Sequence, residues 1–420
     1  MLGLKLSTFG LLFIFVPCSV FATPGPATKI TIEDVVQKVS TTNYKVYTNA
    51  LGVYQSKQSI QSARGNLLPK LDVWKIANVV FDWTSVVGLI QDIAPFLVPN
   101  NWVRVEQTKL LHLANEEGYR AVWANELMTA KSLYIHLLFD ESLLGHIREA
   151  ERELQDVLVI VKSREAMGGV SQGVSSDIEV RLLALQEDAR KLSLLIDQEK
   201  SSLGYMMTIE ARTPIELTAV SIPDFDTFIP LDYEDFEFRT LDSAPETRQY
   251  DFFIMASDYL EKEVLYSFLG GSTISRGTAG GIFDRLPVSG GLGFSSGADM
   301  RIAQAEKEIL KKQKLGIVET IKRQLDLLVT SYNSDLQSYV NLKRQVDLTK
   351  KRQEYLFDRL KLGQNVEAIE LVEASRNHIE ADIGLFDTKF RLLASEDRLS
   401  RLLFHGDYTK KPVVIEELKK

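Results

Sequence analysis

Two long stretches without proline constrain this chain more than any other feature. They run from Trp102 to Arg164 and from Met300 to Leu362, and both are rich in Leu, Glu, Lys, Arg, Gln and Ala. Because these residues favour helix and proline interrupts it, each stretch predicts one helix of about 60 residues. At 1.5 Å per residue, such a helix is about 90 Å long. A compact globular domain cannot contain a helix of that length, so the predicted fold is mostly α and elongated.

The second stretch has a regular apolar pattern. Its apolar residues are spaced by threes and fours, close to the 3.5-residue repeat of a coiled-coil seam. They are Val318, Ile321, Leu325, Leu328, Tyr332, Leu336, Tyr339, Leu342 and Val346.

A short break containing glycine follows each long helix. The first break contains Gly168, Gly169 and Gly173, and the second contains Gly363. Glycine reaches the positive φ angles that reverse a chain at a helix end. A second periodic segment follows each break, at about 176–203 and 366–402, so we predict two αα-hairpins with their turns at these glycines.

Matching residues indicate that the two hairpins are an internal duplication. Arg104 and Gln107 recur as Arg301 and Gln304, an offset of 197 residues. The glycine breaks follow at similar distances, 61 residues from Gln107 to Gly168 and 59 residues from Gln304 to Gly363. Landmarks that recur in the same order are typical of a tandem repeat.

The predicted boundaries follow from this duplication. The first repeat covers 23–211 and the second covers 241–406; between them lies a linker at 212–240 that contains three prolines and a short predicted strand at 215–220. A C-terminal tail follows at 407–420. Each returning helix also ends near a Leu and a Gly, at Leu203-Gly204 in the first repeat and at Leu403 to Gly406 in the second.

The segments before the two long helices differ from the rest of the chain. Residues 67–103 and 268–298 occupy equivalent places in the repeats, and the second is rich in glycine with alternating apolar residues, as in β-strands. The pattern within 72–98 fits two alternating membrane strands and a single apolar helix equally well.

The first 22 residues predict a secretory signal. Lys5 precedes an apolar run, and a small-residue site ends at Ala22, where we expect cleavage. The only cysteine, Cys18, lies inside this segment, so we expect no disulfide and no thiolate site in the mature chain.

No catalytic, cofactor-binding or metal-binding constellation is predicted. The five histidines are scattered without metal-site or catalytic spacing. The formal net charge of −8 becomes about −9 once Lys5 is removed, and no basic stripe stands out, so nucleic acid is not an expected partner. We therefore do not expect an enzyme.

A resemblance to a known family enters through motifs spread over the chain. Asn43, the run Ala63-Arg64-Gly65-Asn66-Leu67-Leu68-Pro69-Lys70-Leu71, Arg301 to Ala305, Arg359 to Gly363 and the closing Ser400-Arg401-Leu402-Leu403 stand in the order found in TolC-like outer-membrane efflux proteins. No single motif is specific, but their order together with the duplication and the signal resembles that family.

The resemblance implies a channel. Each repeat would give long helices to a periplasmic α-barrel and strands to an outer-membrane β-barrel, with the barrel reduced if 72–98 is helical. Three copies would form the exit duct of a tripartite efflux or type I secretion system, in contact with outer-membrane lipid, a periplasmic adaptor and an inner-membrane pump. The alternatives are a periplasmic coiled-coil adaptor and a structural rod without a pore.

The resemblance also suggests where a gate lies. In the family, acidic rings at the periplasmic tips of the returning helices close the duct, and the nearest acids here are Asp177, Glu367 and Glu370. The competing interpretation is that these acids only stabilise the positive ends of their helices. With a net charge near −9, we expect the lumen to be acidic and to favour cations.

Overall fold

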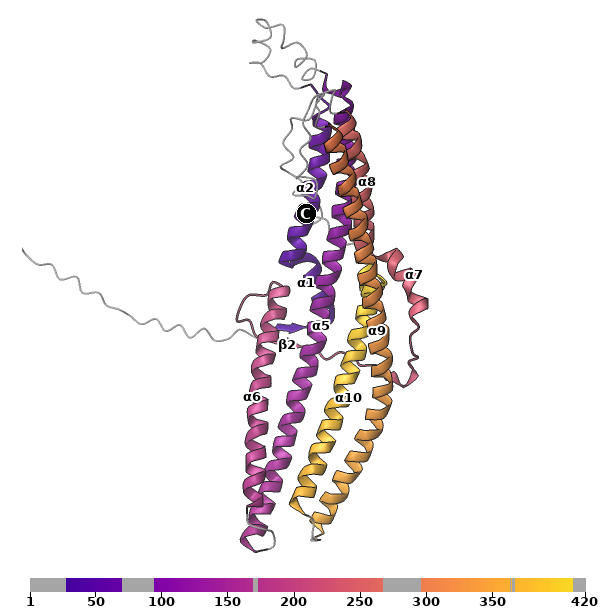
Figure 1. Ribbon diagram of the computed structural model, residues 1–420. Coiled ribbons are helices and arrows are strands. Elements are labelled where there is room, and N and C mark those ends of the chain that lie inside the picture. The colour runs from indigo at the N-terminus through magenta and orange to yellow at the C-terminus, as the bar shows by residue number, and fades with distance from the viewer. Residues whose placement is uncertain are drawn as a thin grey trace, which may run out of the picture.

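The computed structural model is an elongated helical molecule (Figure 1). It describes residues 28–69, 94–168, 173–266, 296–362, 364 and 367–410. Several predictions fall on residues outside these ranges. They are the signal segment, the strands predicted in most of 67–103 and 268–298, and the turn glycines Gly169 and Gly363. Within the described residues, no helix combines the length and the apolar composition needed to cross a lipid bilayer.

Four long helices form the two predicted hairpins. α5 (Pro99–Ala166) is followed by α6 (Val174–Met206), and α9 (Ser296–Lys361) is followed by α10 (Ala368–Leu402). With 68 residues, α5 is about 100 Å long. Pro99 begins α5, where its missing N–H is not needed. α5 and α9 therefore begin inside the segments predicted as strands, at Pro99 and Ser296.

Four shorter helices precede the long ones. They are α1 (Ile32–Thr42) and α2 (Tyr44–Gly65) before α5, and α7 (Tyr233–Ser243) and α8 (Pro245–Tyr266) before α9. α1 and α7 each have 11 residues, and α2 and α8 each have 22. The element order thus repeats, as the residue matches predicted. α7 begins within 212–240, so this segment is only in part a linker.

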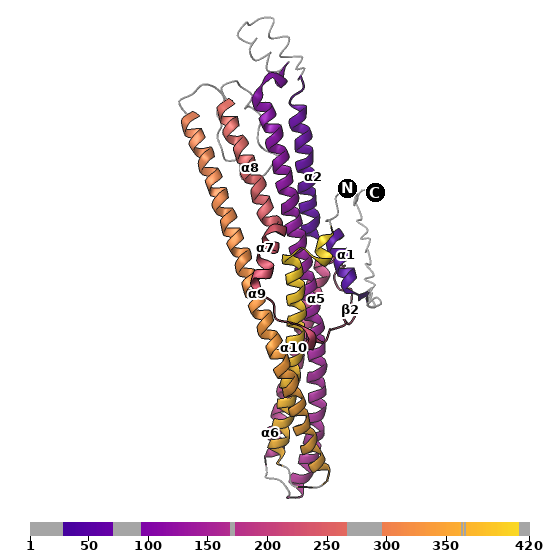
Figure 2. The same ribbon diagram turned by 90° about the vertical axis from the view of Figure 1, so that its right-hand side faces the viewer.

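The helices form a single layer whose neighbours change along the molecule. In one half, α9, α8, α5 and α2 lie side by side (Figure 2). In the other half the order is α9, α10, α5 and α6, and the two hairpin tips end together (Figure 1). One edge of the layer is therefore α9 throughout, and the other edge is first α2 and then α6.

A small sheet lies where the two halves of the layer meet. β1 (Thr28–Ile30) pairs in parallel with β2 (Ile215–Leu217), with Lys29 opposite Glu216. The hydroxyl of Tyr134 on α5 donates to the Ile30 carbonyl at 3.0 Å and fixes the sheet on the helices. β2 falls inside the strand predicted at 215–220.

Three short 3₁₀ helices complete the described elements. They are η2 (Pro95–Leu97), η3 (Phe225–Thr227) and η5 (Gly406–Thr409). η5 belongs to the segment predicted as a tail, yet its Tyr408 is fully buried.

Candidate functional site

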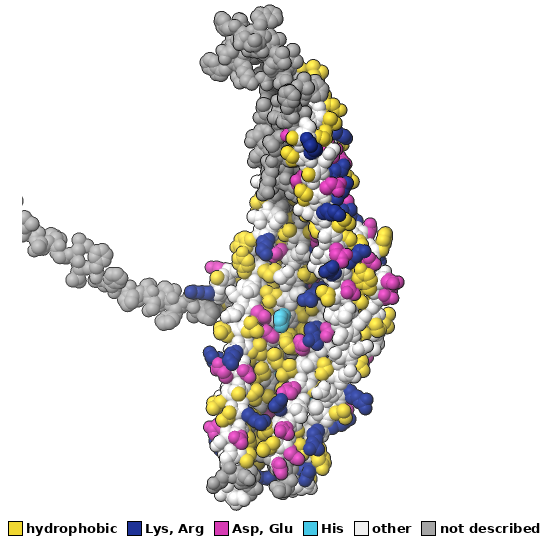
Figure 3. Space-filling model, viewed as in Figure 1, with side chains coloured by type: hydrophobic (Ala, Val, Ile, Leu, Met, Phe, Trp, Pro, Cys, Tyr) yellow, Lys and Arg dark blue, Asp and Glu magenta, His cyan; other side chains and the backbone are white. Residues whose placement is uncertain are grey.

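The two hairpin tips are packed together into one end of the molecule. A buried apolar cluster there draws residues from all four long helices: Leu154, Val157, Leu158 and Val161 of α5, Ile178 and Leu182 of α6, Leu356 of α9, and Leu371, Val372 and Ala374 of α10. Figure 3 shows hydrophobic side chains gathered along this half of the molecule, between α6 and α10. The tips therefore form one body.

The first tip is closed by glycines and by an acid that the sequence did not single out. Gly168 has φ +76° and Gly173, the N-cap of α6, has φ +101°. The Gly173 N–H donates to the Glu165 carboxylate at the end of α5. Hydrogen bonds from Ser175 and from the Gly173 N–H lower the pKa of Glu165. Glu165 thus joins the end of α5 to the start of α6.

The three candidate gate acids lie at this end of the molecule. Asp177 is in the first turn of α6, and Glu370 is in the first turn of α10. Glu367 is the N-cap of α10 and makes no capping hydrogen bond with its side chain. All three side chains are exposed. The structure thus brings the starts of α6 and α10 to one end, while a single chain cannot form a ring of acids.

The helix ends identify which acids are equivalent in the two repeats. α6 and α10 both finish in a Schellman motif, in which Ile209 N–H donates to Gly204 C=O and His405 N–H donates to Ser400 C=O, both at 2.8 Å. The next-to-last residues of the two motifs, Thr208 and Phe404, both have positive φ. The offset between the returning helices is therefore 196 residues.

This offset pairs Asp177 with Glu373, which the sequence reasoning missed. Glu370 matches Val174 instead. The glycine breaks do not give this pairing, because α10 begins at Ala368 and α6 at Val174, an offset of 194. The same offset places Gly204 opposite Ser400 and not opposite Gly406. Glu373 is exposed, as Asp177 is.

A buried ionic cluster joins the two repeats at the middle of the molecule. Lys131 of α5 pairs with Asp397 of α10 and, at 3.1 Å, with Asp407 of η5. The Tyr408 hydroxyl donates to Asp397 at 2.8 Å. The Trp123 ring meets Tyr408 edge-on, with ring centroids 6.5 Å apart. The C-terminal end of the described chain is therefore held in the core by a charged cluster.

The pKa shifts in this cluster fit a stable ion pair. Burial opposes the charge of Lys131, but the carboxylates of Asp397 and Asp407 outweigh it and raise the pKa of Lys131. Burial likewise works against the charge of Asp407, and the Lys131 ammonium outweighs it, so the pKa of Asp407 is lowered. Burial raises the pKa of Tyr408, so its hydroxyl stays protonated and available as a donor.

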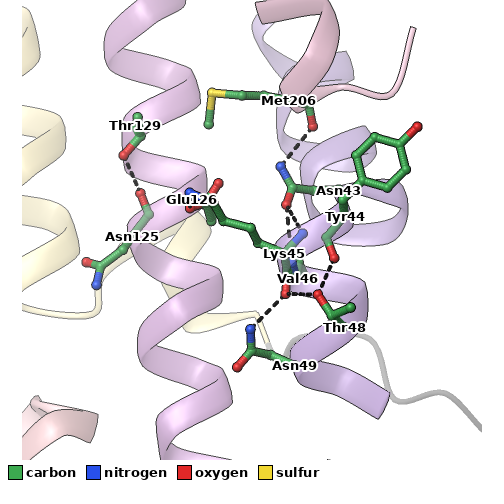
Figure 4. Close-up of polar contacts among 10 residues, drawn as sticks. All are labelled: Asn43, Tyr44, Lys45, Val46, Thr48, Asn49, Asn125, Glu126, Thr129 and Met206. Atoms are coloured by element: carbon green, nitrogen blue, oxygen red, sulfur yellow. Dashed lines mark hydrogen bonds and ion pairs between the residues drawn. The ribbon is translucent and has the colours of Figure 1, made fainter. Parts of the chain in front are cut away.

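Asn43 joins the start of the chain to the end of α6 (Figure 4). It lies between α1 and α2, and its Oδ1 accepts from the backbone N–H groups of Lys45 and Val46 at 2.9 and 3.2 Å. Its Nδ2 donates to the Met206 carbonyl at 2.9 Å. One side chain therefore caps α2 and satisfies a carbonyl at the C-terminal end of α6.

Comparisons with known proteins give the fold. No family model and no curated protein sequence matches this chain. Among solved structures, the Campylobacter jejuni CmeC outer membrane channel matches with TM-score 0.71 and 13% identity over 92% of this chain and 88% of the other. The outer membrane protein VceC from Vibrio cholerae matches with TM-score 0.69 and 11% identity over 89% and 96%. The open-state Neisseria gonorrhoeae MtrE outer membrane channel matches with TM-score 0.66 and 12% identity over 89% and 89%. The chain has the TolC-like fold of these channels, as its sequence predicted.

Proposed function

We propose that this chain is a subunit of an outer-membrane duct for efflux or secretion, in which several copies close a tube. The observation that carries the proposal is that the described residues form a single layer of four helices with an open edge on each side. A layer that is one helix thick leaves the flanks of its edge helices without partners, and closing copies into a ring covers all flanks at once. The similarity to solved channels over about nine tenths of the chain supports the same conclusion.

Exposed apolar residues lie on both edges of the layer. On the α9 edge they are Ile302, Ile309, Leu315, Leu327, Val340, Leu348 and Tyr355. On the opposite edge they are Tyr44, Tyr47 and Leu51 of α2 and Val180, Leu183, Leu194 and Leu195 of α6. A head-to-tail contact between the α9 edge of one copy and the α2–α6 edge of the next would bury both rows. The family resemblance supports three copies.

The end of the molecule opposite the hairpin tips is also apolar. At least half of each of five side chains there is exposed: Phe96 and Leu97 of η2, Trp102 at the start of α5, Leu68 beyond α2 and Leu265 at the end of α8. Apolar and aromatic side chains at one end of a rod suit contact with a lipid boundary. This supports a location in the outer membrane with the hairpins in the periplasm.

The hairpin tips are then the place where an adaptor and a pump would be engaged, and where the duct would close. We propose Asp177 and Glu373 as the equivalent acids of such a gate, with Glu370 and Glu367 nearby. Copies of one carboxylate around a narrow ring repel each other, so a bound cation or a partner's side chain could shift the ring between open and closed. No enzymatic activity forms part of this proposal.

The adaptor alternative is less well supported. We expect an adaptor to place one hairpin within a β-rich domain, whereas the described residues form two hairpins of similar length. A rod without a pore would have no reason to keep apolar rows on both edges.

Fractionation and mass together test the proposal. The mature protein should co-fractionate with outer membranes, and native mass spectrometry of the detergent-extracted protein should give a closed homo-oligomer, a trimer by resemblance. A charged substitution on one edge, Val340→Glu, should dissociate it, while the matched change Val159→Glu at an exposed site on α5, which is not an edge helix, should not. A monomer in the soluble fraction would contradict the proposal.

A further inference from the structure

The apolar seam between α5 and α6 is interrupted at one layer, where two acidic side chains meet. α6 packs on α5, and its seam residues follow a 4-3 spacing: Ile178, Leu182, Leu185, Ala189, Leu192, Ile196, Glu199 and Leu203. Glu199 is the one polar residue in this row. It lies against Asp140 of α5, whose neighbours in its own seam are Leu137 and Leu144. Two acids thus face each other between apolar layers.

Among the described residues, neither acid has a basic partner. Asp140 is 3% exposed, and no described residue donates a hydrogen bond to its Oδ2. The same holds for Oε2 of Glu199. The two carboxyl groups lie within hydrogen-bonding reach of each other. Two ionised carboxylates are both acceptors and cannot bond. One proton between them would turn the contact into a strong O–H···O⁻ hydrogen bond.

We propose that Asp140 and Glu199 share one proton across the α5–α6 seam, and that α6 loosens from α5 when this proton is lost as the pH rises. The pair is then a pH-sensitive latch within the first hairpin. It goes beyond the proposed duct function, because it concerns how one helix is held within a single chain.

The direction of the pH effect follows from the environment of the pair. Burial raises the pKa of Asp140, and burial together with the charge of Asp140 raises the pKa of Glu199. The packed seam therefore binds the proton more tightly than an open one. The stability that the pair contributes is complete below the ordinary carboxyl pKa of about 4 and is lost as the pH rises through the raised pKa values.

The charged groups around this layer do not provide a different partner. His136, one turn before Asp140 on α5, is exposed, and its charge lowers both pKa values, so it opposes the shared proton without replacing it. The other nearby charges have partners of their own: Lys200 of α6 with Glu141 of α5, His146 of α5 with Asp382 of α10, Lys131 with Asp397, and Asp34 of α1 with Thr31. Within the described residues, no group of three or more His, Cys, Asp or Glu side chains is arranged to hold a metal ion.

The second hairpin provides an internal comparison. The 196-residue offset places Ser395 of α10 at the position of Glu199, and Ser395 is buried. Its neutral hydroxyl does not titrate in this range. The second hairpin therefore has no acid at the position of Glu199.

Hydrogen exchange of the full-length protein tests the latch. Protection of amides in 190–206, corrected for intrinsic exchange, should fall by about three- to tenfold between pH 5 and pH 8, since one pKa unit corresponds to about tenfold in an equilibrium.

The variants separate the latch from general effects of charge. In Glu199→Gln the amide donates to Asp140 at every pH, so the pH dependence in 190–206 should disappear with protection kept high. The double variant Asp140→Leu, Glu199→Leu should also be insensitive to pH, and it keeps the test valid if the Gln variant folds poorly. Asp197→Asn, an exposed acid on the same helix, should behave as the unchanged protein.

Three results would overturn the latch. The first is protection of α6 that does not depend on pH in the unchanged protein. The second is pH dependence that persists in Glu199→Gln. The third is recovery of protection at pH 8 on addition of Ca²⁺ or Mg²⁺, because the pair would then be a cation seat and not a proton-sharing contact.

Discussion

Replacing Lys131 with Met should open the joint between the two repeats. The side chain of Lys131 is 11% exposed and that of Asp397 is 9% exposed, so removing the ammonium leaves a buried carboxylate with the Tyr408 hydroxyl as its remaining donor. Breaking a buried ion pair from one side costs about 3–5 kcal/mol. Asp407 is about one-third exposed and can be solvated, so we expect a loss near the lower limit, about 3 kcal/mol.

Hydrogen exchange of the full-length protein measures this loss locally. A change of about 3 kcal/mol corresponds to roughly a hundredfold drop in the protection of residues 397–409. The double variant Lys131→Met, Asp397→Leu should recover most of it, because it leaves no unpaired charge. Lys45→Met provides the matched control: Lys45 also pairs with an acid, Glu126, but its side chain is 67% exposed and the change should have little effect.

The same cluster predicts an acid limit for the joint. Because the pKa of Asp407 is lowered, its contribution to stability is present above the ordinary Asp pKa of about 3.9 and is lost as the pH falls below it.

Two results would refute this account of the joint. One is a loss of protection in Lys131→Met that is smaller than about fivefold, and the other is no recovery of protection in the double variant.

The remaining predictions concern the ends of the helices. Asn43→Ala should lower the local stability by about 1–2 kcal/mol and reduce amide protection at 44–48 and 204–208, because it removes both the cap of α2 and the hydrogen bond to Met206. Asn49→Ala, on the exposed face of α2, is the control and should have little effect. Equal effects of the two substitutions would contradict the capping role. In the assembled protein, Asp177→Asn with Glu373→Gln should raise conductance or weaken block by divalent cations more than Asp177→Asn with Glu370→Gln. A larger effect of Asp177→Asn with Glu370→Gln would argue against the equivalence of Asp177 and Glu373 that the 196-residue offset gives.

Much of this architecture could be predicted from local sequence patterns. The absence of proline from two long stretches and their 3-4 apolar spacing located the long hairpins to within a few residues of α5, α6, α9 and α10. The duplication was also detectable, because Arg104 and Gln107 recur at a fixed offset. α8 was missed, since its 22 residues precede a glycine-rich segment and have no comparable landmark.

The sites that depend on contacts between distant segments could not be predicted. Lys131 and Asp397 are 266 residues apart, and each resembles an ordinary charge on a helix until the fold buries both. Glu199 is different, because it interrupts an otherwise apolar heptad row, and that interruption is visible in the sequence. The pairing of Asp177 with Glu373 could not be read from the sequence, because the glycine breaks differ in length and the helix ends that fix the register are defined by backbone hydrogen bonds.

Planar-bilayer recording tests the central claim most directly. Purified oligomer, added to a neutral lipid bilayer, should give discrete conductance steps with a preference for cations, as expected for a duct built from an acidic chain. The edge variant Val340→Glu, which should not assemble, provides the control for contaminating pores. A folded oligomer that never conducts would contradict the duct, and a clear anion preference would contradict the acidic lumen.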